Sequence, residues 1–257
     1  MAWTTTTETT VCDRSGTAHT ISTGLPVRHD RMDEMPLIVC MDAPWTFGTV
    51  LDATRIMSMS GEAPEAMVVG IGFAEESMGE YLRQRARWLT PTPFEPPPGS
   101  GVKGLVADDC GRASVLHEFV RDQVLPSVMA DHAISERWFV GHSFSGLFGV
   151  RTMLTEPSLF DKWLLASPSI WWDDRAILQL EQAYADEHDD LAVDLFVSGG
   201  EHERDSGFSI VDDALGFVDT LNGRGYPNLR ATATVLAGDG HSNCIGNAVS
   251  KGLRALL

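Results

Sequence analysis

Short apolar runs alternate with segments of helical periodicity along most of this 257-residue chain, and this alternation narrows the choice of folds. The apolar runs predict strands within 35–43, 65–73, 137–143, 160–169, 191–200 and 229–238. Helical spacing predicts helices over 113–129, 144–156, 173–188, 207–225 and 243–257. Such an alternation favours a mainly parallel central sheet with helices on both faces. The sequence therefore predicts an α/β fold, with a site beyond the carboxyl ends of the strands.

The same pattern indicates one domain over residues 1–257, because a chain of this length can still share one hydrophobic core. The segment LTPTPFEPPPGSG at 89–101 is too rich in proline for regular structure, since proline lacks the amide proton. We interpret this segment as a loop excursion within the domain. For the same reason, Pro126 is expected to kink or end the helix over 113–129.

Composition argues against several classes of partner. The formal net charge is −17, from 36 acidic and 19 basic residues, so nucleic acid and anionic membrane surfaces would be repelled. No apolar run is long enough to span a bilayer, and the first residues lack the pattern of a secretory signal. A cytoplasmic location is therefore expected. The four cysteines form no CxxC pair and predict neither a zinc site nor a disulfide.

The segment WFVGHSFSGLFG at 138–149 holds the main indication of chemistry. A nucleophilic serine at a tight strand-to-helix turn needs small residues two positions before it and two positions after it. Ser143 has Gly141 before it and Ser145 after it, whereas Ser145 is followed at that distance by the bulky Leu147. Ser143 is therefore the better candidate. The alternative is an ordinary turn in which serine caps the helix.

A serine nucleophile needs a base, and the base needs an orienting carboxylate. His241 in LAGDGHSN follows the last predicted strand, where the base is expected if the chain order is serine, acid, histidine. The loop SGGEHERDS at 198–206 is expected to supply the acid, and Glu201, Glu203 and Asp205 are all candidates. The alternative for each of these residues is a solvated loop side chain. No metal is expected, because the run EHERD has no second ligand cluster at suitable spacing.

Two other histidines lie close to these motifs. His142 adjoins Ser143, but a neighbour on the same turn normally points elsewhere. His202 lies in the loop that is expected to supply the acid. The remaining histidines come too early in the chain, or lie in or near predicted helices. His241 is therefore the preferred base.

An oxyanion requires two hydrogen-bond donors. The backbone amide of Phe144, directly after the candidate nucleophile, is expected to be one of them. The other is expected from the turn MDAPWTF at 41–47, where Ala43 or Trp45 could supply an amide and Pro44 could not. The alternative is a simple turn, which aspartate and proline favour.

Several of these motifs, taken in order, resemble one known family. LPVRHDRMDEMPLIVCMDAPWTF looks like a stretch that ends in LDG and an aromatic turn, and MVVGIGF with RARWLTPT looks like VVGIG with R-x-R-D-x-T-P. VGHSFSGLFG resembles GHS-x-GGLF, LLASPSIWWDD resembles SPSLWWDD, GGEHER resembles G-E-x-E, and GDGHSN looks like the histidine loop. These are motifs of the α/β-hydrolases of the esterase D type, near the branch of trilactone-siderophore (enterobactin and salmochelin) esterases. The resemblance extends from about Leu25 to the C-terminus, and the match at SPSIWWDD is the most specific.

The resemblance implies the α/β-hydrolase fold and ester hydrolysis through an acyl-enzyme, without metal or organic cofactor. It assigns Ser143 as nucleophile, His241 as base and Glu203 as acid, with Glu201 in reserve. It also implies a set of candidate substrate-binding residues, namely Trp45, Arg85, Arg87, Trp171 and Trp172. The arginines would hold an acidic or catecholate-like group, or else form a solvated pair, and one of the paired tryptophans is expected in the core.

Three positions depart from the family pattern. Ser145 and Ala43 stand where the family has glycine, and Trp88 stands where it has aspartate. The first two changes are expected to tighten the space around the nucleophile and the oxyanion hole, with an effect on activity or substrate.

Together these observations predict a serine carboxylesterase that acts on a small-molecule ester, with a siderophore ester as one candidate. An acyltransferase or a thioesterase could use the same serine. The alternative from a different class is a non-catalytic binding protein that keeps the fold.

Overall fold

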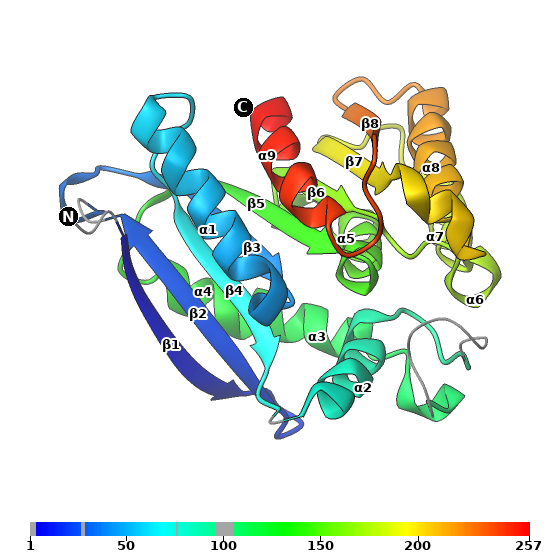
Figure 1. Ribbon diagram of the computed structural model, residues 1–257, viewed down its shortest axis with the longest axis horizontal. Helices are drawn as coiled ribbons and strands as arrows, with labels where there is room; N and C mark the ends of the chain where they lie inside the picture. Colours follow the sequence, from blue (N-terminus) through cyan, green and yellow to red (C-terminus); the bar gives the residue numbers. More distant parts are fainter. Residues whose placement is uncertain (1–3, 27–28, 76, 96–104) are drawn as a thin grey trace.

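The computed structural model describes residues 4–26, 29–75, 77–95 and 105–257, and a twisted eight-stranded sheet forms its centre (Figure 1). The strands are β1 (Thr4–Cys12), β2 (Ala18–Pro26), β3 (Met35–Met41), β4 (Met67–Phe73), β5 (Ile134–His142), β6 (Lys162–Ala166), β7 (Asp194–Gly200) and β8 (Arg230–Leu236). Their order across the sheet is β1-β2-β4-β3-β5-β6-β7-β8. β2 is antiparallel to both β1 and β4, and every pair from β4 to β8 is parallel. The predicted mainly parallel sheet is confirmed.

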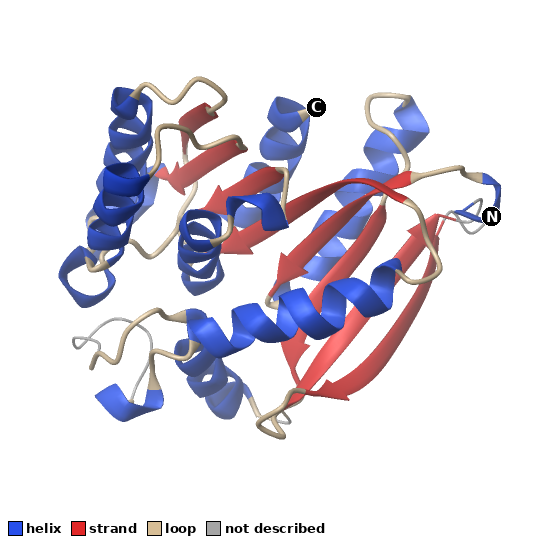
Figure 2. Cartoon of the chain, turned by 180° about the vertical axis from the view of Figure 1, so that it is seen from behind, coloured by secondary structure: helices blue, strands red, loops and turns tan. Residues whose placement is uncertain are grey.

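Helices cover both faces of this sheet, as Figures 1 and 2 show from opposite sides. The α-helices are α1 (Ala43–Ser60), α2 (Met78–Leu89), α3 (Ala113–Phe119), α4 (Leu125–Met129), α5 (Phe144–Thr155), α6 (Trp172–Arg175), α7 (Ile177–Glu187), α8 (Ile210–Arg224) and α9 (Cys244–Leu256). Shorter 3-10 turns occur at His29–Arg31, Ala107–Asp109, Pro157–Leu159 and Glu201–Ser206, and a π-helical turn at Val120–Val124. α1 and α9 pack on one face, and the buried side chains of the other α-helices belong to the core on the opposite face.

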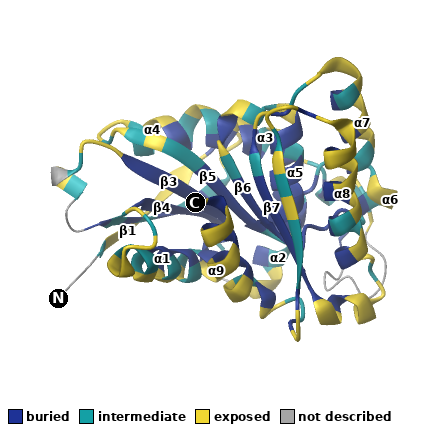
Figure 3. Ribbon diagram, turned by 90° about the horizontal axis from the view of Figure 1, so that it is seen from above, coloured by how far each residue is buried: buried dark blue, intermediate teal, exposed yellow. Residues whose placement is uncertain are grey.

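The alternation of side chains along the strands builds both cores. In β3, Leu37, Val39 and Met41 belong to the core beneath α5 and α8, whereas Ile38 and Cys40 belong to the core beneath α1 and α9. Successive residues of a strand point to opposite faces, so a strand covered on both sides must be apolar throughout. Figure 3 shows these buried strands between helices whose outer surfaces are exposed.

Two strands and two helices were not predicted from the sequence. The hairpin of β1 and β2 adds two antiparallel strands at one edge, and β1 is mostly exposed and rich in threonine, so it contains no apolar run. Threonine nevertheless favours strands because it is β-branched. α1 begins inside the segment interpreted as a turn, and α2 occupies a charged stretch whose buried residues include Tyr81, Trp88 and Leu89. Charged side chains separate the apolar side chains of α2, so the helical periodicity of this segment was not recognised in the sequence.

Two predicted helices differ from the observed ones. The helix predicted over 173–188 is interrupted, because Asp173, Asp174 and Arg175 have positive φ angles of 49°, 49° and 65°, and the regular helix α7 starts at Ile177. Pro126 was expected to kink or end its helix, and it does not end the helical segment, which continues to Met129. A π-helical turn precedes this proline, and in it the amide of Leu125 donates to the carbonyl of Val120. The wider turn accommodates a residue without an amide proton. The proline-rich loop at 89–101 lies partly outside the described residues.

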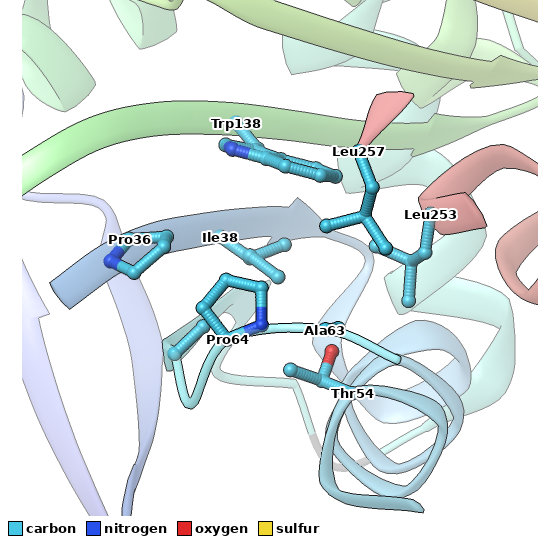
Figure 4. A pocket seen from close by; sticks show the side chains of 9 residues that line it. Pro36, Ile38, Thr54, Ala63, Pro64, Trp138, Leu253 and Leu257 are labelled. Carbon is cyan, nitrogen blue, oxygen red and sulfur yellow. The ribbon is translucent and has the colours of Figure 1, made fainter. Parts of the chain in front are cut away.

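A small apolar pocket lies at the amino ends of β3 and β4, beside the C-terminal end of α9 (Figure 4). Its lining residues are Pro36, Ile38, Thr54, Ala63, Pro64, Ala66, Trp138, Leu253 and Leu257. This is the end of the parallel strands opposite to the one where sites of such sheets form. Among the described residues, no helix has the length and apolarity that crossing a bilayer requires.

Candidate active site

Ser143 lies on a strained turn between β5 and α5. Its φ and ψ angles are 60° and −118°, a conformation that is costly for a residue with a side chain and that recurs at functional sites. A Cβ atom added at Gly141 would lie 2.3 Å from the carbonyl oxygen of Ser145, so the turn requires glycine there. Ser145 is accommodated, because its Oγ atom lies 2.8 Å from both the backbone nitrogen and the carbonyl oxygen of His142. The serine that replaces the family glycine therefore binds the turn itself.

His241 and Glu203 continue from this serine in one hydrogen-bonded series. The Nε2 atom of His241 lies 3.0 Å from Ser143 Oγ, and its Nδ1 atom makes a short hydrogen bond to Glu203 Oε1. Glu203 is buried, whereas Glu201 and Asp205 are exposed. The carboxylate of Glu201 accepts a hydrogen bond from the amide of Gly238 at 2.8 Å. Chain position alone left three acids open and the resemblance favoured Glu203, which is the one that lies against the histidine.

Two further donors hold the second oxygen of Glu203. Ser167 Oγ donates to Oε2 at 2.7 Å, and the amide of Gly200 donates to it at 2.6 Å. Ser167 has a φ angle of 45°, so it also lies on a strained turn, directly after β6. Ser167 was not among the residues predicted from the sequence. Its position directly after a predicted buried strand could have indicated it, because the carboxyl end of that strand lies at the same edge of the sheet as Ser143.

The ring of His142 packs on the candidate base, contrary to the expectation that it would point elsewhere. The centroids of the His142 and His241 rings are 4.6 Å apart, and His142 Nε2 lies 3.6 Å from the Sγ atom of Cys244. Burial lowers the pKa of His142 to about 3, with smaller contributions from the nearby His241 and Arg85. His142 is therefore neutral at physiological pH and packs beside His241 as an uncharged ring.

The two residues expected to donate to an oxyanion both lie at the start of a helix. Ala43 and Phe144 are the first residues of α1 and α5, which follow the neighbouring parallel strands β3 and β5. First-turn amides have no partner within their own helix, and within the described ranges no hydrogen bond is formed by either of these two. The amide of Trp45, the other candidate, donates to the carbonyl of Asp42 at 2.8 Å. The geometry thus favours Ala43 over Trp45 as the donor.

The methyl group of Ala43 does not narrow this region as expected. A Cβ atom added at Gly70 would lie 2.9 Å from Ala43 Cβ, so the methyl group packs against β4. The Ala43 methyl group occupies the space left by the missing side chain of Gly70.

Arg85 is neither a solvated arginine nor a free cation for an anionic substrate. It is buried, and its guanidinium forms a bidentate ion pair with Asp42, with Nε 2.7 Å from Oδ1 and Nη2 3.0 Å from Oδ2. Arg87 is partly exposed and pairs with Asp109 at 3.0 Å. The expected use of Arg85 for binding an acidic group is therefore corrected, because its charge is already neutralised inside the protein.

The three candidate tryptophans have different environments. Trp172 is buried, and its Nε1 atom donates to Thr92, so it is the core member of the pair. Trp171 is partly exposed, and its ring centroid lies 4.5 Å from that of Phe208. Trp45 is exposed at the start of α1. Trp45 and Trp171 are thus the two with aromatic surface available to a ligand.

Within the ranges that the structure describes, no group of three or more histidine, cysteine or acidic side chains is arranged to hold a metal ion. In the loop EHERD, Glu201 and Glu203 are engaged as described, and the amide of His202 donates to the carbonyl of Asp239 at 2.8 Å. These contacts join the acid loop to the histidine loop.

Comparison with known proteins shows the family of this chain. Residues 13–207, more than half of the chain, match the Esterase family. The chain belongs to the Esterase family. The match includes Ser143 and Glu203, and His241 follows it along the chain.

Individual relatives extend the likeness beyond the family match. The ferri-bacillibactin esterase BesA of Bacillus subtilis (strain 168) is 27% identical over 232 residues, which cover 86% of this chain and 78% of that protein. The siderophore triacetylfusarinine C esterase of Aspergillus fumigatus is 29% identical over 177 residues, which cover 66% of this chain and 57% of that protein. The resemblance to siderophore esterases drawn from the motifs is confirmed.

The fold is also that of solved siderophore hydrolases. The structure of siderophore hydrolase EstA from Aspergillus nidulans superposes with a TM-score of 0.83 at 22% identity, and the match covers 96% of this chain and 92% of EstA. The α/β-hydrolase fold predicted for this member of the Esterase family is confirmed.

Proposed function

We propose that this member of the Esterase family is a serine hydrolase that cleaves a carboxylic ester, and that a siderophore ester or a related compound is its substrate. The observation that carries the proposal is the hydrogen-bonded series from Ser143 through His241 to Glu203. The first-turn amides of Ala43 and Phe144 are the candidate oxyanion donors. The siderophore substrates named for the Bacillus and Aspergillus relatives support the choice of substrate class.

The first half of the reaction forms an acyl-enzyme. Ser143 Oγ attacks the ester carbonyl carbon while His241 Nε2 takes the hydroxyl proton, and the negative charge moves to the carbonyl oxygen. The two first-turn amides donate hydrogen bonds to that oxygen. When the carbonyl re-forms, the bond to the leaving oxygen breaks and His241 donates its proton to the departing alcohol. Glu203 holds the histidine ring in orientation and stabilises its charged form.

The second half regenerates the serine. Water attacks the acyl-enzyme carbonyl as His241 Nε2 accepts one of its protons, and the bond to Ser143 Oγ breaks as that oxygen regains a proton. The products are one alcohol and one carboxylic acid. If an alcohol takes the place of water, the product is a new ester, and if the substrate is a thioester, the leaving group is a thiol.

Covalent labelling with a fluorophosphonate, followed by peptide mass mapping, tests the proposal. We expect label on the peptide that contains Ser143, and loss of label in Ser143→Ala and His241→Ala. Ser145→Ala is the matched control, because its hydroxyl binds the backbone of His142 and does not face the base. A folded wild-type protein that takes no label would contradict the hydrolase and favour a binding protein. If Ser143 is labelled, the next step is to compare iron-free and iron-loaded siderophore esters with simple aryl esters as substrates.

A further inference from the structure

A buried ion pair lies next to Ala43 and near the ring of Phe144, the two residues whose amides are the candidate oxyanion donors. Arg85 in α2 and Asp42 at the end of β3 are joined by two hydrogen bonds of 2.7 Å and 3.0 Å, and their side chains are 7% and 1% exposed. Tyr81, one helical turn before Arg85, places its hydroxyl 3.4 Å from the same carboxylate. The pair therefore joins helix α2 to the turn that precedes Ala43.

Asp42 is the residue before α1, but its side chain does not cap that helix. An aspartate at this position normally accepts a hydrogen bond from an amide of the first helical turn. Here the carboxylate is turned toward Arg85, and the backbone is left-handed, with φ 60° and ψ 46°. The orientation of the next peptide group, and hence of the Ala43 amide, depends on this backbone conformation.

Arg85 also contacts the residues on both sides of the site. The carbon of its guanidinium lies 4.4 Å from the centroid of the Trp45 ring and 5.6 Å from that of Phe144. Trp45 belongs to the same turn as Ala43, and Phe144 supplies the second amide. A single rigid, planar cation thus lies against side chains from both segments that carry the candidate oxyanion donors.

We propose that the Arg85–Asp42 ion pair is a positioning device for the oxyanion hole, an inference that rests on the proposed esterase function. A buried ion pair adds little net stability, and well-packed apolar side chains of similar volume often replace one without loss. The location of this ion pair is therefore better explained by a role in positioning the backbone than by a contribution to stability. It holds Asp42 in the left-handed conformation that aims the Ala43 amide, and it fixes the distance from that amide to Phe144.

The test compares Arg85→Met, Arg85→Lys and the double variant Asp42→Asn/Arg85→Met with the wild type. The readouts are kcat and KM for p-nitrophenyl acetate, the inhibition constant of phenylboronic acid, and the unfolding temperature. The boronate adduct on Ser143 is tetrahedral and places an oxygen at the oxyanion position.

For Arg85→Met we expect kcat to fall about tenfold to 100-fold at nearly constant KM, with a parallel rise in the inhibition constant of the boronic acid. The fall is smaller than the roughly 100-fold to 1,000-fold cost of losing a whole donor. Arg85→Lys should recover only part of kcat, because lysine cannot form the bidentate pair.

The double variant separates positioning from charge balance. It leaves no unpaired buried charge, so the unfolding temperature should return toward the wild-type value while kcat stays low. If kcat recovers together with the unfolding temperature, or if Arg85→Met retains full kcat, the positioning role is wrong. Arg83→Met, at an exposed position of the same helix, is the control and should keep wild-type kinetics.

The single variant Asp42→Asn keeps the shape and the buried arginine, so it provides a second test if Arg85→Met does not fold. We expect a smaller fall in kcat than for Arg85→Met, again at constant KM, and an unchanged kcat would contradict the proposal. Failure of the underlying function is distinguishable, because Ser143→Ala would then hydrolyse the ester as fast as the wild type.

Discussion

The Nε2 atom of His241 lies 3.0 Å from the Oγ atom of Ser143, although the two residues are 98 positions apart. The parallel sheet brings them together. Ser143, Ser167, Glu203 and His241 follow β5, β6, β7 and β8, which are consecutive neighbours in the sheet. Because the carboxyl ends of parallel strands share one edge, each of the four strands delivers a residue of the same hydrogen-bonded network.

Replacing Glu203 by glutamine should reduce kcat by about 10³- to 10⁴-fold, because an amide can neither fix the required tautomer nor stabilise the charged His241 ring. Steady-state hydrolysis of an aryl ester measures this effect. Glu201→Gln is the matched control, since the exposed Glu201 binds only the backbone amide of Gly238 among the described residues. Equal activity of the two variants would remove Glu203 from the mechanism.

Ser167→Ala should have a smaller effect on the same reaction. Its hydroxyl donates to Glu203 Oε2, while the amide of Gly200 donates to the same oxygen and remains in the variant. A hydrogen bond to a buried charge contributes about 1.5–3 kcal/mol, so we expect unfolding to become easier by about that amount. The fall in kcat should be well below that of Glu203→Gln. Chemical denaturation and initial rates on one preparation test both statements, and a loss of kcat as large as that of Glu203→Gln would contradict them.

Gly141→Ala should destabilise the fold by at least about 2–3 kcal/mol, because the added methyl group would lie 2.3 Å from a backbone oxygen of the next helix. Backbone cannot move aside as a flexible side chain does. Gly216→Ala in α8 is the control, since no atom lies within 4 Å of the added carbon. That change should stabilise the protein by about 0.5–1 kcal/mol through helix propensity. Denaturant unfolding of both variants would show whether the two effects have opposite signs.

Acid should destabilise the folded protein partly through His142. Its folded pKa is lowered to about 3 by burial, whereas an unfolded histidine has a pKa of about 6.5, so the unfolded chain binds the extra proton between these values. The stability from this residue is complete above pH 6.5 and is lost as the pH falls, at a rate that approaches about 1.4 kcal/mol per pH unit below pH 6.5. Burial also lowers the pKa values of His19 and His117, which act in the same direction.

Thermal unfolding between pH 7.5 and pH 5 tests this prediction. His142→Gln cannot take up a proton, so its unfolding temperature should fall less steeply with acid than that of the wild type. Parallel curves for the two proteins would show that the His142 ring is not held neutral.

Much of the fold follows from local sequence patterns. The apolar runs of β3 to β7 and the periodic helices α5 and α8 were predictable, because a strand buried on both faces is apolar throughout and an amphipathic helix repeats every 3.6 residues. The hairpin of β1 and β2 was not predictable in this way. Its outer strand is mostly exposed, and its pairing depends on contacts with β2 that no local pattern displays.

The sequence by itself determined the order of the serine, the acid loop and the histidine, and the small residue needed before the nucleophile, since these depend on chain order and on backbone sterics at one turn. The family resemblance favoured Glu203 among the three acids, and the tertiary structure places it against His241. Only the tertiary structure decided that Ala43 and not Trp45 keeps an amide without a partner among the described residues, and that Arg85 pairs with Asp42. Each of these choices depends on side-chain direction and on partners from distant strands and helices. Spacing along the chain specifies neither, because neighbouring side chains in a loop point in different directions until packing selects one.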